Sequence, residues 1–147
     1  RLDAAHYDIL TLNSASIPGL DFISTGGSLD RIAKTKTIAD YDPAYKYLNV
    51  CVTAVENDST CFKCVRTMLT LDALGKLDKF SAVFDVQYYM NHRKKYIERM
   101  YADGKFGNDE SLLLLFPLFK SELTIRVKIS AIIHKVQNAV RCRIFKR

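Results

Sequence analysis

Residues 59–77 read STCFKCVRTMLTLDALGKL, and this stretch predicts the central helix of the fold. Ser59 or Thr60 is a suitable N-cap, because a hydroxyl can accept a hydrogen bond from an amide group of the first turn. Gly75 follows the last apolar residue of the run, in the position of the glycine that ends many helices. The helix is therefore expected to bury an apolar face and to expose a polar one. The apolar face comprises Cys61, Cys64, Met68, Leu71, Ala73 and Leu74, and the polar face comprises Lys63, Arg66, Thr70 and Asp72.

The same stretch contains the strongest candidate for a metal site. With Cys51 its cysteines form the pattern C-x9-C-x2-C, and Asp58 lies three residues before Cys61. A tetrahedral zinc site takes four ligands from cysteine, histidine or carboxylate, and two cysteines spaced i, i+3 on a helix face the same way. The candidate ligands are therefore Cys51, Asp58, Cys61 and Cys64. Two other interpretations stay open here: buried cysteines that act as small hydrophobic residues, and a redox pair.

Hydrophobic periodicity predicts further helices on both sides of this stretch. They cover residues 29–40, 43–47, 85–102 and the C-terminal segment from Ile125 onward. Ser28 is the expected N-cap of the first, and Asp103 with Gly104 is expected to end the third. A short buried helix is expected to follow residues 108–111, with Pro117 as its kink or stop.

Short strands are predicted where β-branched and apolar residues cluster, at 7–12, 20–24 and 48–55. Pro18 and Gly19 lie between the first two and favour a turn. The expected fold class is mainly α with a few short strands near the N-terminus, in a single helical domain over 1–147. Within it we distinguish a cysteine-containing segment, 28–80, and a basic helical segment, 86–147.

Composition and charge narrow the class of protein. With 48% hydrophobic residues, 6 Gly and 3 Pro, the chain is neither collagen-like nor low-complexity nor disordered. The net charge of +6 is uneven, since residues 1–85 hold 9 Lys/Arg and 11 Asp/Glu, whereas residues 86–147 hold 13 and 5. A basic half is a candidate surface for an acidic partner or for nucleic acid. Nucleic acid is the less favoured partner, because the basic residues alternate with apolar ones as on the solvent face of a helix.

The sequence predicts neither a membrane span nor secretion. The longest apolar run, 112–119, is eight residues long, whereas a spanning helix needs about 20. The first residues, RLDAAHYDIL, lack the basic and apolar regions of a secretory signal. Four cysteines are too few for a disulfide-based fold, so a cytoplasmic location is expected. Because the sequence starts at Arg1 and not at Met, we expect it to be a fragment of a longer polypeptide.

Residues 28–80 resemble a recurring element of the ATP-pyrophosphatases, the adenine nucleotide alpha-hydrolase-like proteins that include the 7-cyano-7-deazaguanine synthase group. The shared pattern is a cysteine at a strand end, then C-x2-C-x2-C, Arg-Thr and a leucine-rich helix ending in glycine. The matching positions are Cys51, Cys61, Cys64, Arg66, Thr67 and Gly75. Upstream, residues 29–39 with Arg31, Lys34 and Ile38 are similar to the helix that leads into the strand.

The resemblance implies that the chain is the C-terminal portion of an α/β, Rossmann-like, ATP-dependent enzyme of unknown substrate. It implies a zinc knuckle at the candidate ligands, and Arg66 and Lys36 as the cofactor-binding groups. Asp58 stands where the family has a cysteine, so the knuckle is degenerate. The family's nucleotide loop, SGGxDS, is absent, and residues 24–28, STGGS, match it only in part. ATP binding would therefore require an N-terminal nucleotide-binding domain outside this sequence.

The alternative function is that of a non-catalytic helical interaction module. Its basic segment, 86–147, would bind an acidic partner or nucleic acid. An apolar face left uncovered by a missing domain would also favour a homo-oligomer.

Overall fold

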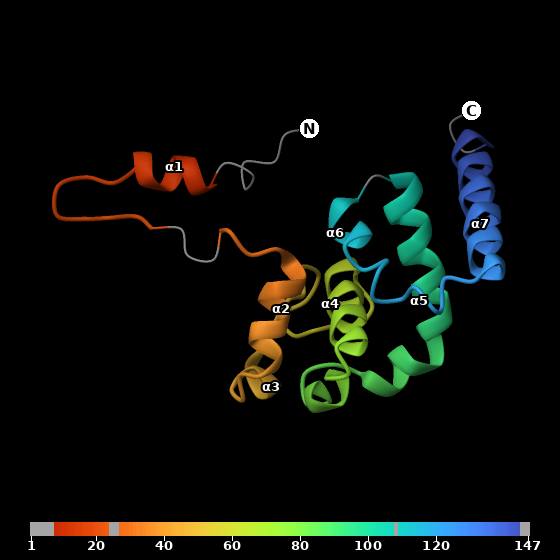
Figure 1. The fold of residues 1–147 in the computed structure, drawn as a ribbon, viewed down its shortest axis with the longest axis horizontal. Coiled ribbons are helices and arrows are strands. Elements are labelled where there is room, and N and C mark those ends of the chain that lie inside the picture. The colour runs from red at the N-terminus through yellow and green to blue at the C-terminus, as the bar shows by residue number, and fades with distance from the viewer. Residues whose placement is uncertain (1–7, 24–26, 108, 145–147) are drawn as a thin grey trace.

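The protein is mainly helical, as Figure 1 shows. The computed structural model describes residues 8–23, 27–107 and 109–144. In chain order the elements are α1 (Asp8–Ser14), α2 (Arg31–Ala39), α3 (Ala44–Tyr47), α4 (Phe62–Ala73), the 3₁₀ helix η2 (Leu77–Phe80), α5 (Val86–Gly107), α6 (Glu110–Leu113) and α7 (Ile125–Ile144). Among these residues, no helix combines the length and apolar character needed to cross a bilayer.

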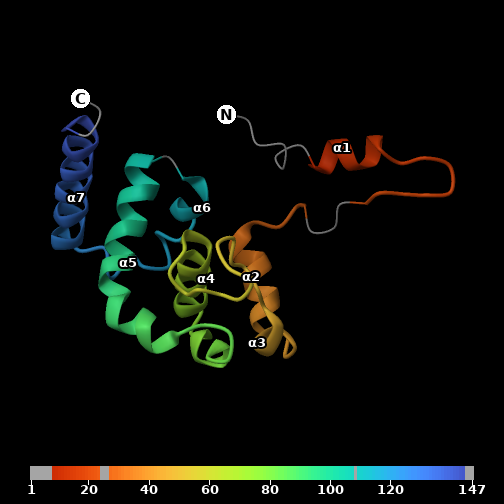
Figure 2. The same cartoon turned by 180° about the vertical axis from the view of Figure 1, so that it is seen from behind.

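Helix α4 lies at the centre of the packed body. It contacts α2 on one side and α5 on the other, while α6 and α7 both pack against α5. Helix α1 and the segment that follows it extend away from this body, and both views place α1 and α7 at opposite ends of the long axis (Figures 1 and 2). The body is therefore a stack of helices with α4 and α5 in the middle and α7 as its outer layer.

One hydrophobic core runs through the body from α2 to α7. Tyr89 of α5 is fully buried and stacks on Tyr96 with ring centroids 5.7 Å apart. Phe80 of η2 is equally buried and meets the ring of Tyr45 edge-on at 5.1 Å. The other large side chains that are buried in this core are Met68, Leu69, Leu71, Leu115 and Phe119. The central position of α4 follows from its contribution of three of these residues.

Both ends of α4 have well-defined caps. Cys61 is the N-cap, and its Sγ accepts a hydrogen bond from the Cys64 amide at 3.4 Å. The predicted caps Ser59 and Thr60 are wrong, because both belong to the preceding loop. At the other end Gly75 has a φ of +64°, as predicted. Its amide donates to the Asp72 carbonyl and the Lys76 amide donates to that of Leu71, which is a Schellman motif.

The polar face predicted for α4 is only partly exposed. Lys63 is exposed, but Arg66 is 8% and Thr70 1% exposed. The Thr70 hydroxyl donates a hydrogen bond to the Arg66 carbonyl, one helical turn earlier, at 2.9 Å. The prediction was wrong because α2 and α5 cover α4 on two sides. The helix therefore buries more of its surface than the apolar stripe on one face indicates.

The predicted short strands are wrong within the described residues. Residues 8–12 belong to helix α1, and only Ile17 and Leu20 form an isolated bridge across the Pro18–Gly19 turn. That turn is confirmed, with Gly19 at a φ of +85°. Residues 48–55 form an irregular loop in which Val52 and Val55 are 62% and 90% exposed. A strand needs a neighbour to pair with, and here none is adjacent.

The remaining helices differ from prediction mainly at their ends. Helix α2 begins at Arg31, because the Asp30 carboxylate and not Ser28 caps it, accepting from the Ala33 amide at 2.7 Å. Helix α5 continues through Asp103 and Gly104 to Gly107. The predicted stop fails because Gly104 is buried against Phe116, where a side chain would have no room. Helix α7 begins at Ile125 as predicted.

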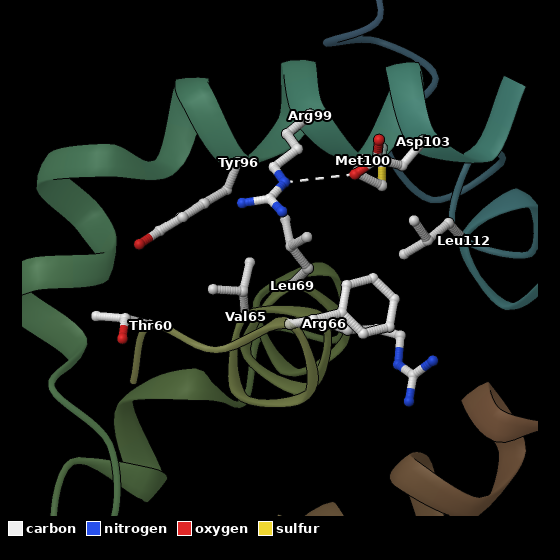
Figure 3. Close-up of a pocket in the computed structure, with 10 residues that line it drawn as sticks. Thr60, Val65, Arg66, Leu69, Tyr96, Arg99, Met100, Asp103 and Leu112 are labelled. Atoms are coloured by element: carbon white, nitrogen blue, oxygen red, sulfur yellow. Dashed lines mark hydrogen bonds and ion pairs between the residues drawn. The ribbon is translucent and has the colours of Figure 1, made fainter. Parts of the chain in front are cut away.

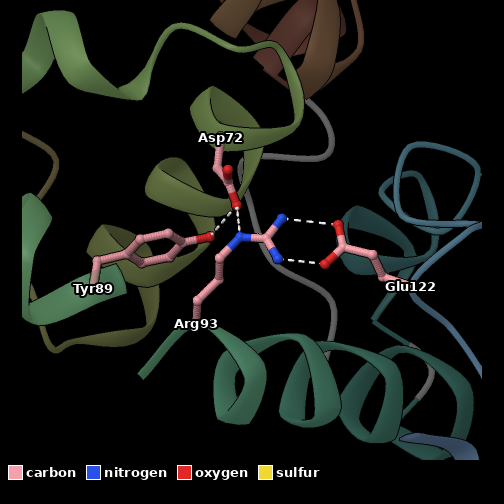
Figure 4. A network of polar contacts seen from close by, with 4 residues as sticks. All are labelled: Asp72, Tyr89, Arg93 and Glu122. Carbon is pink, nitrogen blue, oxygen red and sulfur yellow. Dashed lines mark hydrogen bonds and ion pairs between the residues drawn. The ribbon is translucent and has the colours of Figure 1, made fainter. Parts of the chain in front are cut away.

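A polar network connects three parts of the body (Figure 4). Arg93 of α5 donates from Nε to Asp72 of α4 at 2.8 Å, and its other nitrogens bind the Glu122 carboxylate, one of them at 2.8 Å. The Tyr89 hydroxyl donates to the same Asp72 oxygen at 2.8 Å. The hydrogen bonds from Arg93 lower the pKa of Glu122, and those to the carboxylates raise the pKa of Arg93. The network therefore holds the segment before α7 against α4 and α5.

Candidate metal centre

The loop between α3 and α4 is organised by the side chain of Asn57. Its Oδ1 accepts from the Val50 amide at 2.9 Å, and its Nδ2 donates to the carbonyls of Leu48 at 2.7 Å and Val83 at 3.1 Å. A loop lacks the backbone ladder of a helix or a sheet, so its amide and carbonyl groups need such partners. Asn57 thus ties the start of the loop to the segment before α5.

Four candidate ligands converge at the end of this loop. One ligand atom from each of Cys51, Asp58, Cys61 and Cys64 lies within 4.8 Å of every other. The Sγ atoms of Cys51 and Cys61 are 3.8 Å apart. Cys64 is fully buried, whereas the other three are partly exposed. The structure therefore brings together all four residues that the sequence pattern singled out.

The spacing suits a tetrahedral thiolate site. With a zinc–sulfur bond of about 2.3 Å, two sulfurs at tetrahedral corners lie about 3.8 Å apart. The Cys51–Cys61 pair already has this separation. The widest pairs, at up to 4.8 Å, would need to close by about 1 Å on binding. The donor set fits zinc, since three soft sulfurs select Zn²⁺, Cu⁺ or an iron–sulfur cluster and the carboxylate oxygen disfavours the softer alternatives.

Asp58 is held as an anion by its neighbours. Its Oδ1 accepts from the amides of Thr60 and Cys61, both at 2.9 Å, and its Oδ2 accepts from the Thr53 hydroxyl at 2.5 Å. The hydrogen bond from Thr53 and the two amide bonds hold the pKa of Asp58 well below its usual range. A carboxylate so oriented can offer a metal ion an oxygen in place of a thiolate.

The thiols of Cys51 and Cys64 both donate hydrogen bonds before any metal binds. The single proton of the Thr53 hydroxyl is donated to Asp58, so the Cys51 thiol donates to the Thr53 oxygen, 3.1 Å from its sulfur. Burial raises the pKa of Cys64, whose thiol points at Asn57 Oδ1 at 3.7 Å. Both cysteines must therefore release a proton when a metal binds.

Ser59 shapes the turn into the cluster. It is a non-glycine residue at a positive φ, +56°, and only 3% of it is exposed. Its hydroxyl accepts from the Asp85 amide at 2.8 Å, and Asp85 in turn caps the start of α5 by accepting from the Tyr88 amide at 2.8 Å. The left-handed backbone at Ser59 is thus stabilised by a contact to the next long helix.

Arg66 and Lys36, the predicted cofactor-binding groups, lie in different surroundings. Lys36 is exposed on α2. Arg66 is buried, with one guanidinium nitrogen donating to Ser111 Oγ at 2.8 Å and with its Nε unpartnered. Burial lowers the pKa of Arg66, and the nearby charge of Arg31 adds to this effect. The structure does not bring Arg66 and Lys36 to one described pocket.

A small apolar pocket lies between α4 and α5 (Figure 3). Its rim carries an Arg99–Asp103 ion pair at 3.3 Å, and the Arg66 guanidinium points away from that pair. Its walls include Val65, Leu69, Tyr96, Met100 and Leu112. With its polar groups already paired or turned away, this pocket offers weaker chemistry than the cysteine cluster.

The roles of Asn57 and Thr53 were not predicted from the sequence, and Ser59 was predicted only as a helix cap. Thr53 lies in the run that was predicted to be a strand, and Asn57 and Ser59 lie in the polar run that follows it. The only available signal was the run Glu56-Asn57-Asp58-Ser59-Thr60, because asparagine, aspartate and serine often bind loop backbone through their side chains. Their contacts are with residues such as Val83 and Asp85, which no local pattern links to them.

Comparisons with protein-family models, with curated proteins and with solved structures each found no match for this chain.

Proposed function

We propose that the chain is a helical interaction module whose loop and central helix are fastened by one structural Zn²⁺ ion. The observation that supports this proposal is the convergence of Cys51, Asp58, Cys61 and Cys64, with ligand atoms within 4.8 Å of one another. Four protein ligands complete a tetrahedral shell and leave no open position for a substrate, which is typical of structural rather than catalytic zinc.

The ion would add a further connection between segments that side-chain hydrogen bonds of Asn57 and Asp58 already hold together. Cys51 and Asp58 belong to the irregular loop, whereas Cys61 and Cys64 belong to the start of α4. The amides at this helix N-terminus favour the negative charge of thiolate ligands. Zinc binding would also displace the proton of Cys64, so affinity should weaken as the pH falls.

Elemental analysis and thermal unfolding of the 147-residue chain test this proposal. We expect one zinc per chain, and a melting temperature that falls when a chelator is added. Cys61→Ser should lose the ion and become insensitive to the chelator. Cys142→Ser serves as the matched control, because the proposed ligand set does not use that cysteine. A chain that is folded, metal-free and unaffected by chelator would overturn the proposal in favour of cysteines that only pack.

Substitutions of Asp58 separate metal binding from loop stability. Asp58→Asn keeps an oxygen that can accept from the Thr60 and Cys61 amides but removes the anionic ligand. We expect weaker zinc affinity and a smaller, separate loss of stability in the metal-free chain, because a neutral amide accepts weaker hydrogen bonds than the carboxylate. Asp58→Cys supplies a thiolate and should bind zinc at least as tightly as the natural chain. Equal zinc affinity in Asp58→Asn would exclude the carboxylate as a ligand.

The ATP-dependent function is a second proposal, and it rests on the resemblance over residues 28–80. It assigns this module to the C-terminal region of an enzyme whose Rossmann-like nucleotide domain lies elsewhere in the polypeptide. The intact mass of the native protein tests it. A longer protein with an upstream SGGxDS loop, whose activity is lost in Cys61→Ser, would support it; a native protein without that loop would not.

A further inference from the structure

Helix α7 carries an apolar stripe that none of the residues in 8–23, 27–107 and 109–144 covers. Val127 and Ala131 are buried against the body, and α5 is the helix that α7 packs on. The stripe lies on the other side of α7. It comprises Ile125 (75% exposed), Ile129 (52%), Ile132 (47%), Ile133 (52%) and Val136 (57%). The spacing of 4, 3 and 4 residues from Ile125 to Val136 is that of a helix seam that docks a second apolar segment.

The N-terminal arm, residues 8–23, presents a second uncovered apolar surface. Its two parts are the short helix α1 and the Pro18–Gly19 turn, and it extends away from the body (Figure 1). Five large apolar side chains of the arm are exposed: Leu10 (70%), Ile17 (60%), Leu20 (51%), Phe22 (41%) and Ile23 (73%). Apolar surface concentrated in this way usually marks an interface.

The two segments have opposite charge. The sequence of the arm contains two aspartates and no lysine or arginine, and the side chain of Asp21 is exposed. Helix α7 contains five basic residues and no acidic one. Lys128 is exposed and Lys135 partly exposed, and being seven residues apart they lie along the same edge of the stripe. An acidic apolar segment is the natural complement of such a helix, because it buries the stripe and offsets this basic edge.

We infer that the arm of one copy of this chain docks on the α7 stripe of a second copy. The arm and α7 of the same copy lie at opposite ends of the long axis, with α2, α4 and α5 between them, so this contact forms between copies (Figures 1 and 2). If each copy lends its arm to the other, two identical contacts close a symmetric dimer. This inference names the partner of the proposed interaction module and does not depend on the metal ion.

Direct pairing of two α7 helices is the less favourable arrangement. It would bury the stripes but bring Arg126, Lys128 and Lys135 of one copy toward the same residues of the other. Like charges that face each other across a helix pair are destabilising. A stable dimer buries at least about 1,200 Å² in total, so each of two reciprocal arm contacts needs to contribute about 600 Å².

Light scattering coupled to size-exclusion chromatography tests the inference on the 147-residue chain over a range of concentrations. We expect a concentration-dependent dimer. The double variant Ile129→Glu/Ile133→Glu on α7 and the double variant Leu10→Ser/Ile17→Ser on the arm should each raise the dissociation constant at least tenfold. Tyr47→Glu is the control, since Tyr47 is 80% exposed and belongs to neither surface. Circular dichroism would verify that each variant is folded.

Mixing the two double variants distinguishes arm exchange from α7 pairing. The arm variant keeps a normal α7, and the α7 variant keeps a normal arm, so an equimolar mixture can form one intact contact. We expect the mixture to form a 1:1 heterodimer at a lower concentration than either variant dimerises alone, and at a higher one than the natural chain, because one of the two contacts is restored. Charge reversal gives a second measure: Lys128→Glu/Lys135→Glu should weaken the dimer, and Asp21→Lys on the arm should restore it in part.

Three results would overturn the inference: a monomer at every concentration, a dimer that survives the arm variant, or variants that fail to complement each other. A monomer that retains one zinc per chain would contradict the arm exchange and still support the zinc-binding module. A metal-free chain that dimerises through its arm would contradict the zinc site and still support the arm exchange.

Discussion

The Sγ atoms of Cys51 and Cys61 lie 3.8 Å apart although the residues are ten positions apart in the chain. Their approach closes the loop that precedes α4, and it does so without a β-sheet. Side-chain hydrogen bonds from Asn57 hold the first half of this loop, and those to Asp58 hold the second. The candidate metal centre is therefore built on a scaffold of polar side chains.

Asn57→Leu should destabilise the protein and weaken the metal site together. The change removes the partners of the Val50 amide and of the Leu48 and Val83 carbonyls. Leaving such groups unpaired should lower the free energy of unfolding by about 2 kcal/mol, measurable by urea denaturation. Asn91→Leu is a matched control, because exposed Asn91 accepts only a 3.3 Å bond from Gln87. Equal losses in the two variants would contradict the role given to Asn57.

Arg93→Met should release the segment before α7 from α4 and α5. The variant keeps an apolar stem but leaves Asp72 and Glu122 without their shared cation. We expect the free energy of unfolding to fall by about 2 kcal/mol, with Arg93→Lys intermediate because an ammonium group cannot bind both carboxylates in the same way. Lys94→Met, at the exposed next position, should have little effect. An unchanged free energy of unfolding in Arg93→Met would show that the network does not stabilise the fold.

The same network predicts an acid-dependent loss of stability. Hydrogen bonds from Arg93 lower the pKa of Glu122 in the folded protein from its ordinary value of 4.5. Because its pKa is lowered in the folded protein, ionised Glu122 stabilises the fold at every pH above 4.5. This contribution is lost as the pH falls below 4.5 and through the lower pKa of the folded state. The stability difference between the natural chain and Glu122→Gln should thus be full at pH 7 and shrink below pH 4.5. A difference that stays constant with pH would argue against the ion pair.

Two glycines of α5 should respond in opposite ways to alanine. At Gly104 a new Cβ would lie 3.0 Å from two ring atoms of Phe116, and that ring is stacked on Tyr101. Because the stacked ring of Phe116 has little freedom to move, overpacking at Gly104 should outweigh the gain in helix propensity and lower the free energy of unfolding by about 1 kcal/mol. At Gly107, the last residue of α5, no atom lies within 4 Å, so alanine should stabilise the protein by a few tenths of a kcal/mol, less than the gain of about 1 kcal/mol expected in a helix interior. Thermal or urea unfolding compares them, and stabilisation by both would contradict the close packing at Gly104.

Much of this protein follows from local sequence signals alone. The apolar periodicity of α4, its C′ glycine at Gly75, the start of α7 at Ile125 and the turn at Pro18–Gly19 all depend on neighbours within a few residues. Cys61 and Cys64 could be paired from the sequence as well, because their spacing at a helix start makes them face the same way, whereas the approach of Cys51 and Asp58 depends on the folded loop. Such features are encoded by short-range geometry, so a pattern is sufficient to predict them.

Other features were decided by contacts between distant segments. Residues 48–55 have the composition of a strand, but the part of the chain that the structure describes holds no strand beside them, and Asn57 organises them as a loop. Arg66 has the position of a surface residue and is buried because Ser111, 45 residues away, supplies a partner. Gly104 lies within α5 because Phe116 packs on it. Burial and pairing depend on what the rest of the chain brings near, and only the tertiary structure determines that.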